Sequence, residues 1–252
     1  MSKIIAISGK GGTGKTTIAA LLVRAFKENG AGPVLAVDAD PNANLGDMLG
    51  VKVESTIGDI CEEAKRNESF PAGMTKNEYL RFMLERIVSE EDGFDLLTMG
   101  RPEGPGCYCY ANNILRDSLK MLTANYKFVI IDNEAGFEHI SRKTNLKIDY
   151  LVIVTDPSLP GVDTAEKILN LAEKIGLPIA KSYVIINRAH DNVGQTIGEK
   201  AKSIGVEILA TVKEDNCISK QALSGKSIFA MPTECVTLKT INSLVKKFNN
   251  TN

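Results

Sequence analysis

The segment Gly9-x-x-x-x-Gly14-Lys15-Thr16 limits the possible folds of this chain more than any other segment of the sequence. A β-branched run from Lys3 to Ser8 leads into it, and a stretch of helical period from Thr16 to Asn29 follows. Glycines leave backbone N–H groups free to point at phosphate oxygens, and a helix N-terminus adds positive potential. In this strand–loop–helix context the segment predicts a phosphate-binding loop at the edge of an α/β sheet.

Each position of the loop has an expected role. Lys15 is expected to reach the β- and γ-phosphates of a nucleotide and to act in catalysis, while the Thr16 hydroxyl is expected to bind Mg²⁺. The remaining nucleotide-binding positions are Gly9, Lys10, Gly11, Gly12, Thr13, Gly14 and Thr17. An ordinary glycine-rich turn is the alternative, which the full motif and its flanks disfavour.

Short β-branched runs alternate with longer helical stretches along the chain. This pattern predicts an α/β fold over residues 1–252, forming one domain with a mostly parallel central sheet and helices on both faces. Strands are expected at Lys3–Ser8, Val34–Asp38, Asp95–Met99, Phe128–Asp132, Leu151–Thr155, Ser182–Asn187 and Ile208–Thr211. Residues 51–93 are less clearly patterned and predict a helical insertion, in which Thr75 and Glu78 resemble a capping box before a helix ending near Ile87.

Charge and cysteine content exclude several classes of function. The 30 basic and 31 acidic residues nearly cancel, so no long-range field draws the chain to nucleic acid or into stable membrane association. No apolar run approaches the length of a transmembrane helix, and the N-terminus lacks a signal peptide, which favours a cytoplasmic protein. Five cysteines in such a compartment are poorly explained by disulfides. We expect Cys61, Cys217 and Cys235 to be core or incidental.

Three aspartates follow expected strands at the edge where open α/β sheets bind ligands. If the chain is extended at Asp38 and Asp40, both carboxylates point the same way, so one could serve Mg²⁺ through water and the other the attacking water. Either could instead cap a following helix. Asp132, which ends an apolar strand, is expected to hold Mg²⁺ through water.

Cys107 and Cys109 form the most distinctive pair in the sequence. In an extended backbone, residues two apart face the same side, so both sulfur atoms could bind one soft metal ion. Tetrahedral zinc or square-planar nickel takes four ligands, and a two-fold dimer would supply the other two. Two thiols without a metal are the alternative.

Lys10, inside the loop, resembles the second lysine of the deviant-P-loop ATPases, the group that contains the MinD/ParA proteins. In that group this lysine crosses a dimer interface to the partner's phosphates, so the resemblance implies catalysis by Lys10 in an ATP-dependent homodimer. It also implies that Asp40 positions the attacking water and that Gly136 presents its N–H to the γ-phosphate. A solvated loop lysine and a structural turn glycine are the alternatives.

The segment from Tyr183 to Arg188 resembles the strand that presents an adenine-reading asparagine, here Asn187, in the same ATPases. An amide suits this role because it offers both a donor and an acceptor. The guanine-reading pattern is missing, which favours ATP over GTP. Lys213 departs from the resemblance, since relatives often have proline there.

The chain also resembles the CooC-type nickel-insertion accessory ATPases of carbon monoxide dehydrogenase and the similar acetyl-CoA synthase maturation factors. The resemblance is carried by Cys107-x-Cys109, by Gly9-Lys10-Gly11-Gly12, and by the segment from Asp132 to His139 with Arg142 and Thr144. It implies Ni²⁺ or Zn²⁺ held between subunits by the cysteines and delivered to the metalloenzyme apoprotein. His139 is a further metal-ligand candidate, although a structural role is more common for a lone histidine.

Two other functions share such a nucleotide site. A MinD/ParA-like positioning ATPase would bind membrane or DNA, and its support is an amphipathic stripe formed by Leu238, Ile241, Leu244, Val245 and Phe248. A closing helix packed on the sheet explains the same stripe. An electron-donating iron protein would need two well-separated cysteines, and the adjacent pair argues against it.

Overall fold

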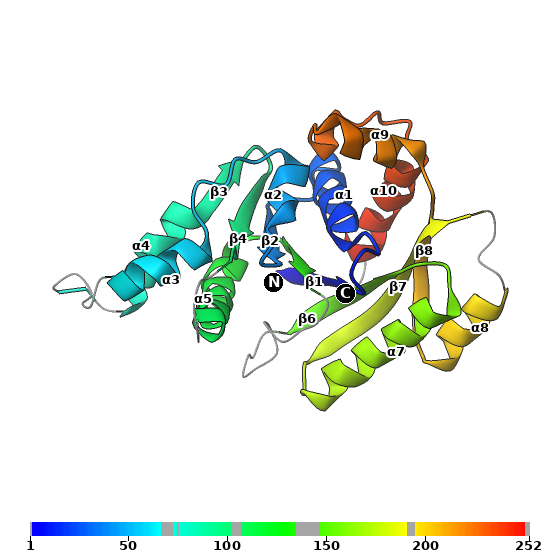
Figure 1. Cartoon of the computed structure of the whole chain (residues 1–252), viewed down its shortest axis with the longest axis horizontal. Helices are drawn as coiled ribbons and strands as arrows, with labels where there is room; N and C mark the ends of the chain where they lie inside the picture. Colours follow the sequence, from blue (N-terminus) through cyan, green and yellow to red (C-terminus); the bar gives the residue numbers. More distant parts are fainter. Residues whose placement is uncertain are drawn as a thin grey trace.

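The computed structural model describes residues 2–66, 73–74, 76–101, 107–134, 147–190 and 195–249. Within these ranges an eight-stranded sheet runs in the order β3-β4-β2-β5-β1-β6-β7-β8 (Figure 1). Its strands are β1 Lys3–Gly9, β2 Val34–Ala39, β3 Val88–Glu91, β4 Phe94–Thr98, β5 Phe128–Asn133, β6 Ile148–Thr155, β7 Ile179–Ala189 and β8 Glu207–Lys213. Neighbouring strands are parallel except β3 and β4.

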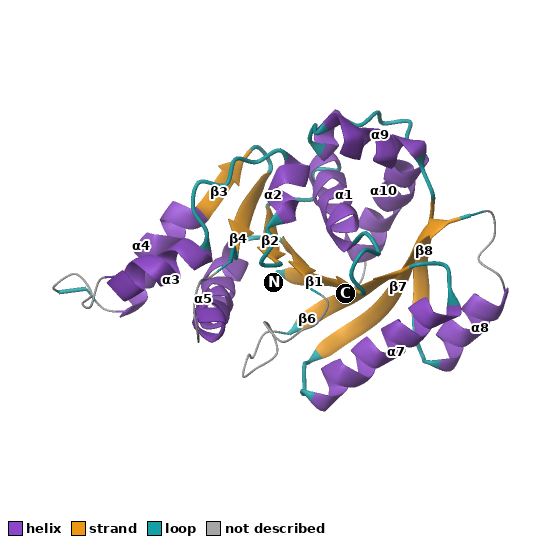
Figure 2. Cartoon of the chain, in the orientation of Figure 1, coloured by secondary structure: helices purple, strands orange, loops and turns teal. Residues whose placement is uncertain are grey.

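Helices cover both faces of this sheet (Figure 2). They are α1 Lys15–Glu28, α2 Asn44–Leu49, α3 Ile57–Arg66, α4 Lys76–Ile87, α5 Cys107–Leu122, α7 Leu159–Lys174, α8 Gln195–Ser203, α9 Asn216–Ser224 and α10 Val236–Asn249, with 3₁₀ turns η1 Thr123–Asn125 and η2 Ile228–Ala230. Helices α1, α2 and α10 enclose one apolar core, and α3, α4, α5, α7 and α8 enclose the other. In the described ranges no helix has the length and apolar character needed to cross a bilayer.

The α/β fold with a mostly parallel sheet is confirmed, and all seven expected strands are present. The sequence did not predict β3, a short antiparallel edge strand that is half exposed and therefore lacks an apolar run. The insertion at 51–93 contains α3 and α4 together with β3, and α4 ends at Ile87 as expected. Thr75, the expected cap of α4, lies outside the described residues.

The apolar stripe near the C-terminus belongs to α10 and is buried. Leu238, Ile241 and Phe248 are fully enclosed, and Leu244 and Val245 are at most 5% exposed. Helix α10 packs on α1 and β8 as a closing helix. The stripe is therefore part of the core, and the sequence feature that favoured a membrane-binding helix is accounted for by packing.

Two expectations about the cysteines are wrong. Cys217 and Cys235 form a disulfide, because the fold brings the starts of α9 and α10 together, which spacing in the sequence does not reveal. Helix α5 begins at Cys107, so the backbone at Cys107 and Cys109 is helical instead of extended. Successive residues of a helix turn by about 100°, so strand alternation does not place these two positions on one side. Cys61 is buried in the core, as expected.

Candidate nucleotide site

The glycine-rich loop lies at the carboxyl edge of the sheet, between β1 and α1. β1 pairs with β5 on one side and β6 on the other, so the loop emerges near the centre of the sheet. The Lys15 ammonium donates to the carbonyl oxygen of Lys10 at 3.3 Å, and the Thr13 hydroxyl donates to the same oxygen at 2.9 Å. These bonds curl the loop around a cationic side chain that is only 9% exposed.

The amide of Asn187 ties the loop to β7. Its Nδ2 donates to the carbonyl oxygen of Thr13 at 2.8 Å, and the side chain is 8% exposed. Gly14 makes this approach possible, because a Cβ atom there would collide with the Asn187 amide. The backbone of Gly14 also has φ +93°, a conformation that side chains rarely allow.

We therefore expect Gly14→Ala to lower the free energy of unfolding by about 1–3 kcal/mol, since it combines positive φ with a steric clash. The matched control is Gly11→Ala, because Gly11 belongs to the same loop and a Cβ there would meet nothing within 4 Å. Urea unfolding of both variants without nucleotide measures the difference. Equal stability of the two variants would show that the loop does not need Gly14.

Two buried carboxylates lie directly below the loop. Asp38 on β2 is opposite Asp132 on β5 in the strand register, and Asp132 is also opposite Ile7 of β1. Burial, together with the negative charge of Asp132, raises the pKa of Asp38 to about 7, although the hydrogen bond from the Leu45 N–H lowers it. Burial also raises the pKa of Asp132 to about 6, although a hydrogen bond from Thr16 and the charge of Lys15 lower it.

Asp132 is the better fit for a divalent cation. Its Oδ1 is buried and has no hydrogen-bond partner among the described residues, while the side chain also bonds the Thr16 hydroxyl. An anionic oxygen without a partner is costly unless a cation or water satisfies it. The Thr16 hydroxyl and the Asp132 carboxylate together form the hard oxygen donor set that Mg²⁺ prefers.

Asp38 has a second structural role. Its Oδ2 accepts the N–H of Leu45 in the first turn of α2 at 2.8 Å, and its Oδ1 accepts the N–H of Asp40 at 3.2 Å. Asp38 therefore accepts a hydrogen bond from the first turn of α2, as the helix-capping alternative predicts. Asp40 lies beyond the end of β2, where its Oδ1 accepts two bonds from Asn42, so strand alternation does not relate the two aspartates.

A cavity of about 930 Å³ opens beside the loop. This volume lies within the range of small-molecule sites. Loop residues, Asp40 and the β7 pair Asn187 and Arg188 line one part of it, and α1, the segment 42–48 with α2, and the segment from β8 to α10 line the rest. The lining residues that sequence reasoning missed are Ile18, Leu21, Asn42, Asn44, Asp47, Met48, Val212, Glu214, Asp215, Ile218, Ser219, Gln221, Ala222, Gly225, Lys226, Ile228 and Thr237. Among these residues only Asp215 could have been found from the sequence, because it lies two residues after Lys213, the position where relatives often have proline.

The adenine-reading candidates lie at an irregular end of β7. The pairing of β7 with β8 shifts register between Ile186 and Ala189, and Arg188 has φ 55°, which is uncommon for a residue with a side chain. The irregularity places Arg188 at the surface and Asn187 against the loop. Strained backbone of this kind is frequent at binding sites.

Several predicted positions cannot be placed. Gly136, His139, Arg142 and Thr144 lie outside the described residues. Lys10 is exposed on the loop, while Thr16 and Thr17 at the start of α1 are partly buried and line the cavity. The structure thus brings the loop together with Asp38, Asp40, Asp132, Asn187 and Arg188, and it leaves the cysteine pair at the start of another helix, α5.

A parallel sheet with this loop and these carboxylates at its carboxyl edge defines a P-loop nucleotide-binding protein. Residues 4–228 match the CobQ/CobB/MinD/ParA nucleotide binding domain, and the chain belongs to that family.

Relatives agree with this assignment. An uncharacterised ATP-binding protein of Methanocaldococcus jannaschii is 40% identical over 98% of both chains. The carbon monoxide dehydrogenase accessory protein CooC of Rhodospirillum rubrum is 36% identical over 69% of this chain and 70% of its own. The septum site-determining protein MinD of Pyrococcus horikoshii, in complex with Mg-ADP, superposes with a TM-score of 0.75 and 28% identity, covering 99% of this chain and 97% of its own.

Proposed function

We propose that this chain is a Mg²⁺-dependent ATPase that dimerises on binding ATP and uses the cycle to deliver nickel or zinc to a metalloenzyme apoprotein. The observation that carries the ATPase proposal is the carboxylate of Asp132 beside Thr16, because its buried Oδ1 has no hydrogen-bond partner among the residues that the structure describes. The cysteine pair and the likeness to CooC, a carbon monoxide dehydrogenase accessory protein, support carbon monoxide dehydrogenase or acetyl-CoA synthase as the recipient.

Residues of this chain would bind the phosphates, hold Mg²⁺ and orient the attacking water during hydrolysis. Lys15 leaves its bond to the Lys10 carbonyl and places its ammonium on the β- and γ-phosphates, where loop N–H groups also donate. Thr16 would bind Mg²⁺ through its hydroxyl, and Asp132 and Asp38 would hold the ion through water. When bound, the ion would neutralise phosphate charge. Asp40, partly exposed on the cavity wall, would orient the attacking water.

The adenine end of ATP would lie against the carboxyl ends of β7 and β8. Asn187 has one amide hydrogen on the Thr13 carbonyl, which leaves its Oδ1 and second hydrogen for a ligand. Arg188 and the start of α9 would close the other side, since both line the same cavity. Gly136, by resemblance, would sense the γ-phosphate.

The metal is the cargo of this cycle. Cys107 and Cys109 belong to the first turn of α5, so their two thiolates leave a soft ion short of four ligands within one subunit. A two-fold dimer would bring a second pair, and ATP-controlled dimerisation would then control metal binding and release.

A MinD/ParA-like positioning ATPase is the second candidate, supported by the superposition on MinD with Mg-ADP. In this candidate function the same ATP cycle would control binding to membrane or DNA instead of binding of a metal ion. Burial of the α10 stripe removes the membrane-binding surface that the sequence offered.

Lys10 gives the direct test of the dimer. In the wild type we expect ATP with Mg²⁺ to double the mass measured by light scattering, and ADP to leave it monomeric. Lys10→Ala should stay monomeric with ATP while still binding it, because the exposed Lys10 side chain is available to a partner. A Lys10→Ala protein that dimerises and hydrolyses ATP like the wild type would refute the proposed cross-subunit role.

A further inference from the structure

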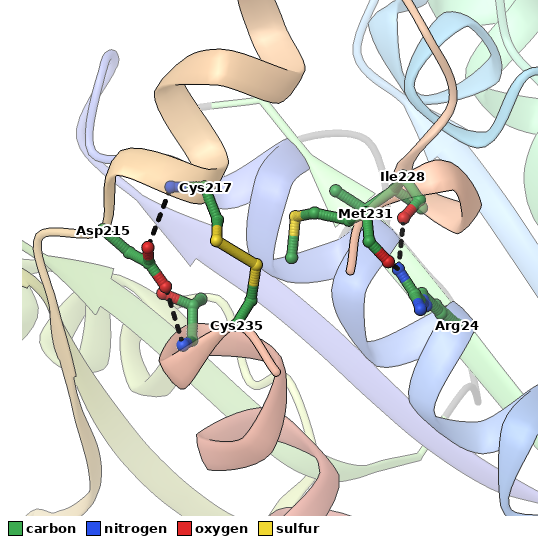
Figure 3. The surroundings of a disulfide bond; sticks show 7 residues. Arg24, Asp215, Cys217, Ile228, Met231 and Cys235 are labelled. Atoms are coloured by element: carbon green, nitrogen blue, oxygen red, sulfur yellow. Dashed lines mark hydrogen bonds between the residues drawn. A yellow bond between two sulfur atoms is a disulfide. The ribbon is translucent and has the colours of Figure 1, made fainter. Parts of the chain in front are cut away.

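A disulfide between Cys217 and Cys235 joins the starts of α9 and α10 (Figure 3). Cys217 is the second residue of α9, and Cys235 directly precedes α10. The two Cα atoms are 6.1 Å apart, although 18 positions separate the residues in sequence. The proposed ATP chemistry uses neither sulfur atom.

Asp215 connects the same two helices by hydrogen bonds. One carboxylate oxygen accepts the N–H of Cys217 at 2.8 Å, and the other accepts the N–H of Thr237 at 3.1 Å. Asp215 therefore caps α9 and α10 together, next to the disulfide (Figure 3). Asp215 and Thr237 also line the nucleotide cavity.

Helix α9 lines that cavity and is only partly buried, with Ile218 packed against the apolar core. None of its residues is fully buried, and Leu223 is 88% exposed. The far end of the segment is held by Arg24 of α1, whose guanidinium donates to the carbonyl oxygens of Ile228 at 2.6 Å and Met231 at 2.9 Å. The wall is thus fixed at one end by Arg24 and at the other by Asp215 and the disulfide.

We propose that Cys217 and Cys235 are a thiol–disulfide exchange site for a dithiol reductant, and that its state sets the affinity of the cavity for nucleotide. Cys217 is partly exposed, whereas Cys235 is 3% exposed, so attack occurs at the Cys217 sulfur. A reductant thiolate bonds to that sulfur, the S–S bond breaks, and Cys235 leaves as a thiolate that takes up a proton.

The second thiolate of the reductant then attacks the reductant's own sulfur in the mixed disulfide. This step forms the cyclic disulfide of the reductant and releases Cys217, which is also protonated. Two electrons and two protons have passed from the dithiol to the protein. A disulfide oxidant reverses the sequence.

Reduction weakens nucleotide binding because it removes the covalent link at the start of α9 and leaves the Asp215 hydrogen bonds and the packing of Ile218 to hold that end. A ligand that needs an ordered wall then loses affinity by the cost of ordering it. This inference rests on the proposed nucleotide site.

The test measures the dissociation constant of a fluorescent ADP analogue with Mg²⁺, before and after treatment with dithiothreitol. Intact mass after alkylation of the denatured chain reports the disulfide. We expect the reduced wild type to bind roughly three- to tenfold more weakly than the oxidised protein. The dissociation constant of Cys217→Ser/Cys235→Ser should equal that of the reduced wild type and should not change with dithiothreitol. The dissociation constant of Cys107→Ser/Cys109→Ser should still change on reduction.

Equal dissociation constants for oxidised and reduced wild type would overturn the redox inference and leave the ATP site standing. Failure of both forms to bind the analogue would instead refute the proposed function. Zinc retained stoichiometrically by the reduced wild type, but not by Cys217→Ser/Cys235→Ser, would also overturn the inference. It would assign the triad Asp215, Cys217 and Cys235, whose ligand atoms lie within 4.8 Å of one another, to a metal site.

Discussion

Lys15→Ala is expected to lower the turnover number for ATP roughly 10²- to 10³-fold, the loss typical when a preorganised donor to developing charge is removed. The ammonium of Lys15 is nearly enclosed by the loop and bonds only weakly, at 3.3 Å, to the Lys10 carbonyl. Folding should therefore change little, by about 1 kcal/mol. Phosphate release at saturating Mg-ATP measures the rate.

Lys52→Ala is the matched control for Lys15. Lys52 is a surface lysine with 90% of its side chain exposed, and its contact to Glu54 is a solvent-exposed ion pair. Its loss should leave hydrolysis unchanged. A Lys15→Ala turnover within about threefold of the wild type would show that the loop lysine does not stabilise the transition state.

Asp132→Asn is expected to stabilise the nucleotide-free protein at pH 8 while reducing hydrolysis by at least about 100-fold. The folded pKa of Asp132, about 6, is raised above the ordinary value of 3.8. The folded state thus holds the proton more tightly, and ionisation of the buried carboxylate costs stability as pH rises through about 6. The asparagine variant avoids that cost.

The stability gain of Asp132→Asn should accordingly vanish only below the ordinary pKa of 3.8, at about pH 3, where the carboxyl is mostly protonated in both folded and unfolded chains, and it should reach about 1–3 kcal/mol by pH 8. Urea unfolding at several pH values follows it. Asp92→Asn, at a carboxylate that is 97% exposed, should show no comparable trend. A variant less stable than the wild type at pH 8 would mean that the ionised Asp132 is well compensated without Mg²⁺.

The parts of the fold with a periodic apolar signal were predictable. β5 reads as an uninterrupted apolar run because it is covered on both faces, and the phosphate loop follows directly from its flanking strand and helix. β3 was not predictable, since an exposed edge strand carries no such run.

The arrangement of the site was predicted in part. Strand order alone brings Asp38, Asp132 and Asn187 to one edge, and the residues at the ends of the strands could be chosen from the sequence. Tertiary hydrogen bonds decide which carboxylate keeps an oxygen atom without a partner. Asp38 accepts the N–H of Leu45 through Oδ2, whereas Oδ1 of Asp132 has no partner in the described part of the chain.

The cysteines show the limit of spacing arguments. The argument that Cys107 and Cys109 face the same side holds for an extended backbone, but a helix starts there. Cys217 and Cys235 have no sequence pattern at all, and they meet only because α9 and α10 begin side by side. Pairing set by tertiary structure leaves no local signal.

Nucleotide is proposed to control a metal ion held by paired cysteines of two subunits. Native mass spectrometry with Ni²⁺ or Zn²⁺ tests it, on the wild type, Cys107→Ser/Cys109→Ser and the control Cys217→Ser/Cys235→Ser, each with ADP and with ATP. We predict that, with ATP at a saturating concentration for every variant, the wild type and the control form dimers carrying one metal ion, and that the Cys107→Ser/Cys109→Ser dimer carries none. An unchanged metal content in Cys107→Ser/Cys109→Ser would contradict the account.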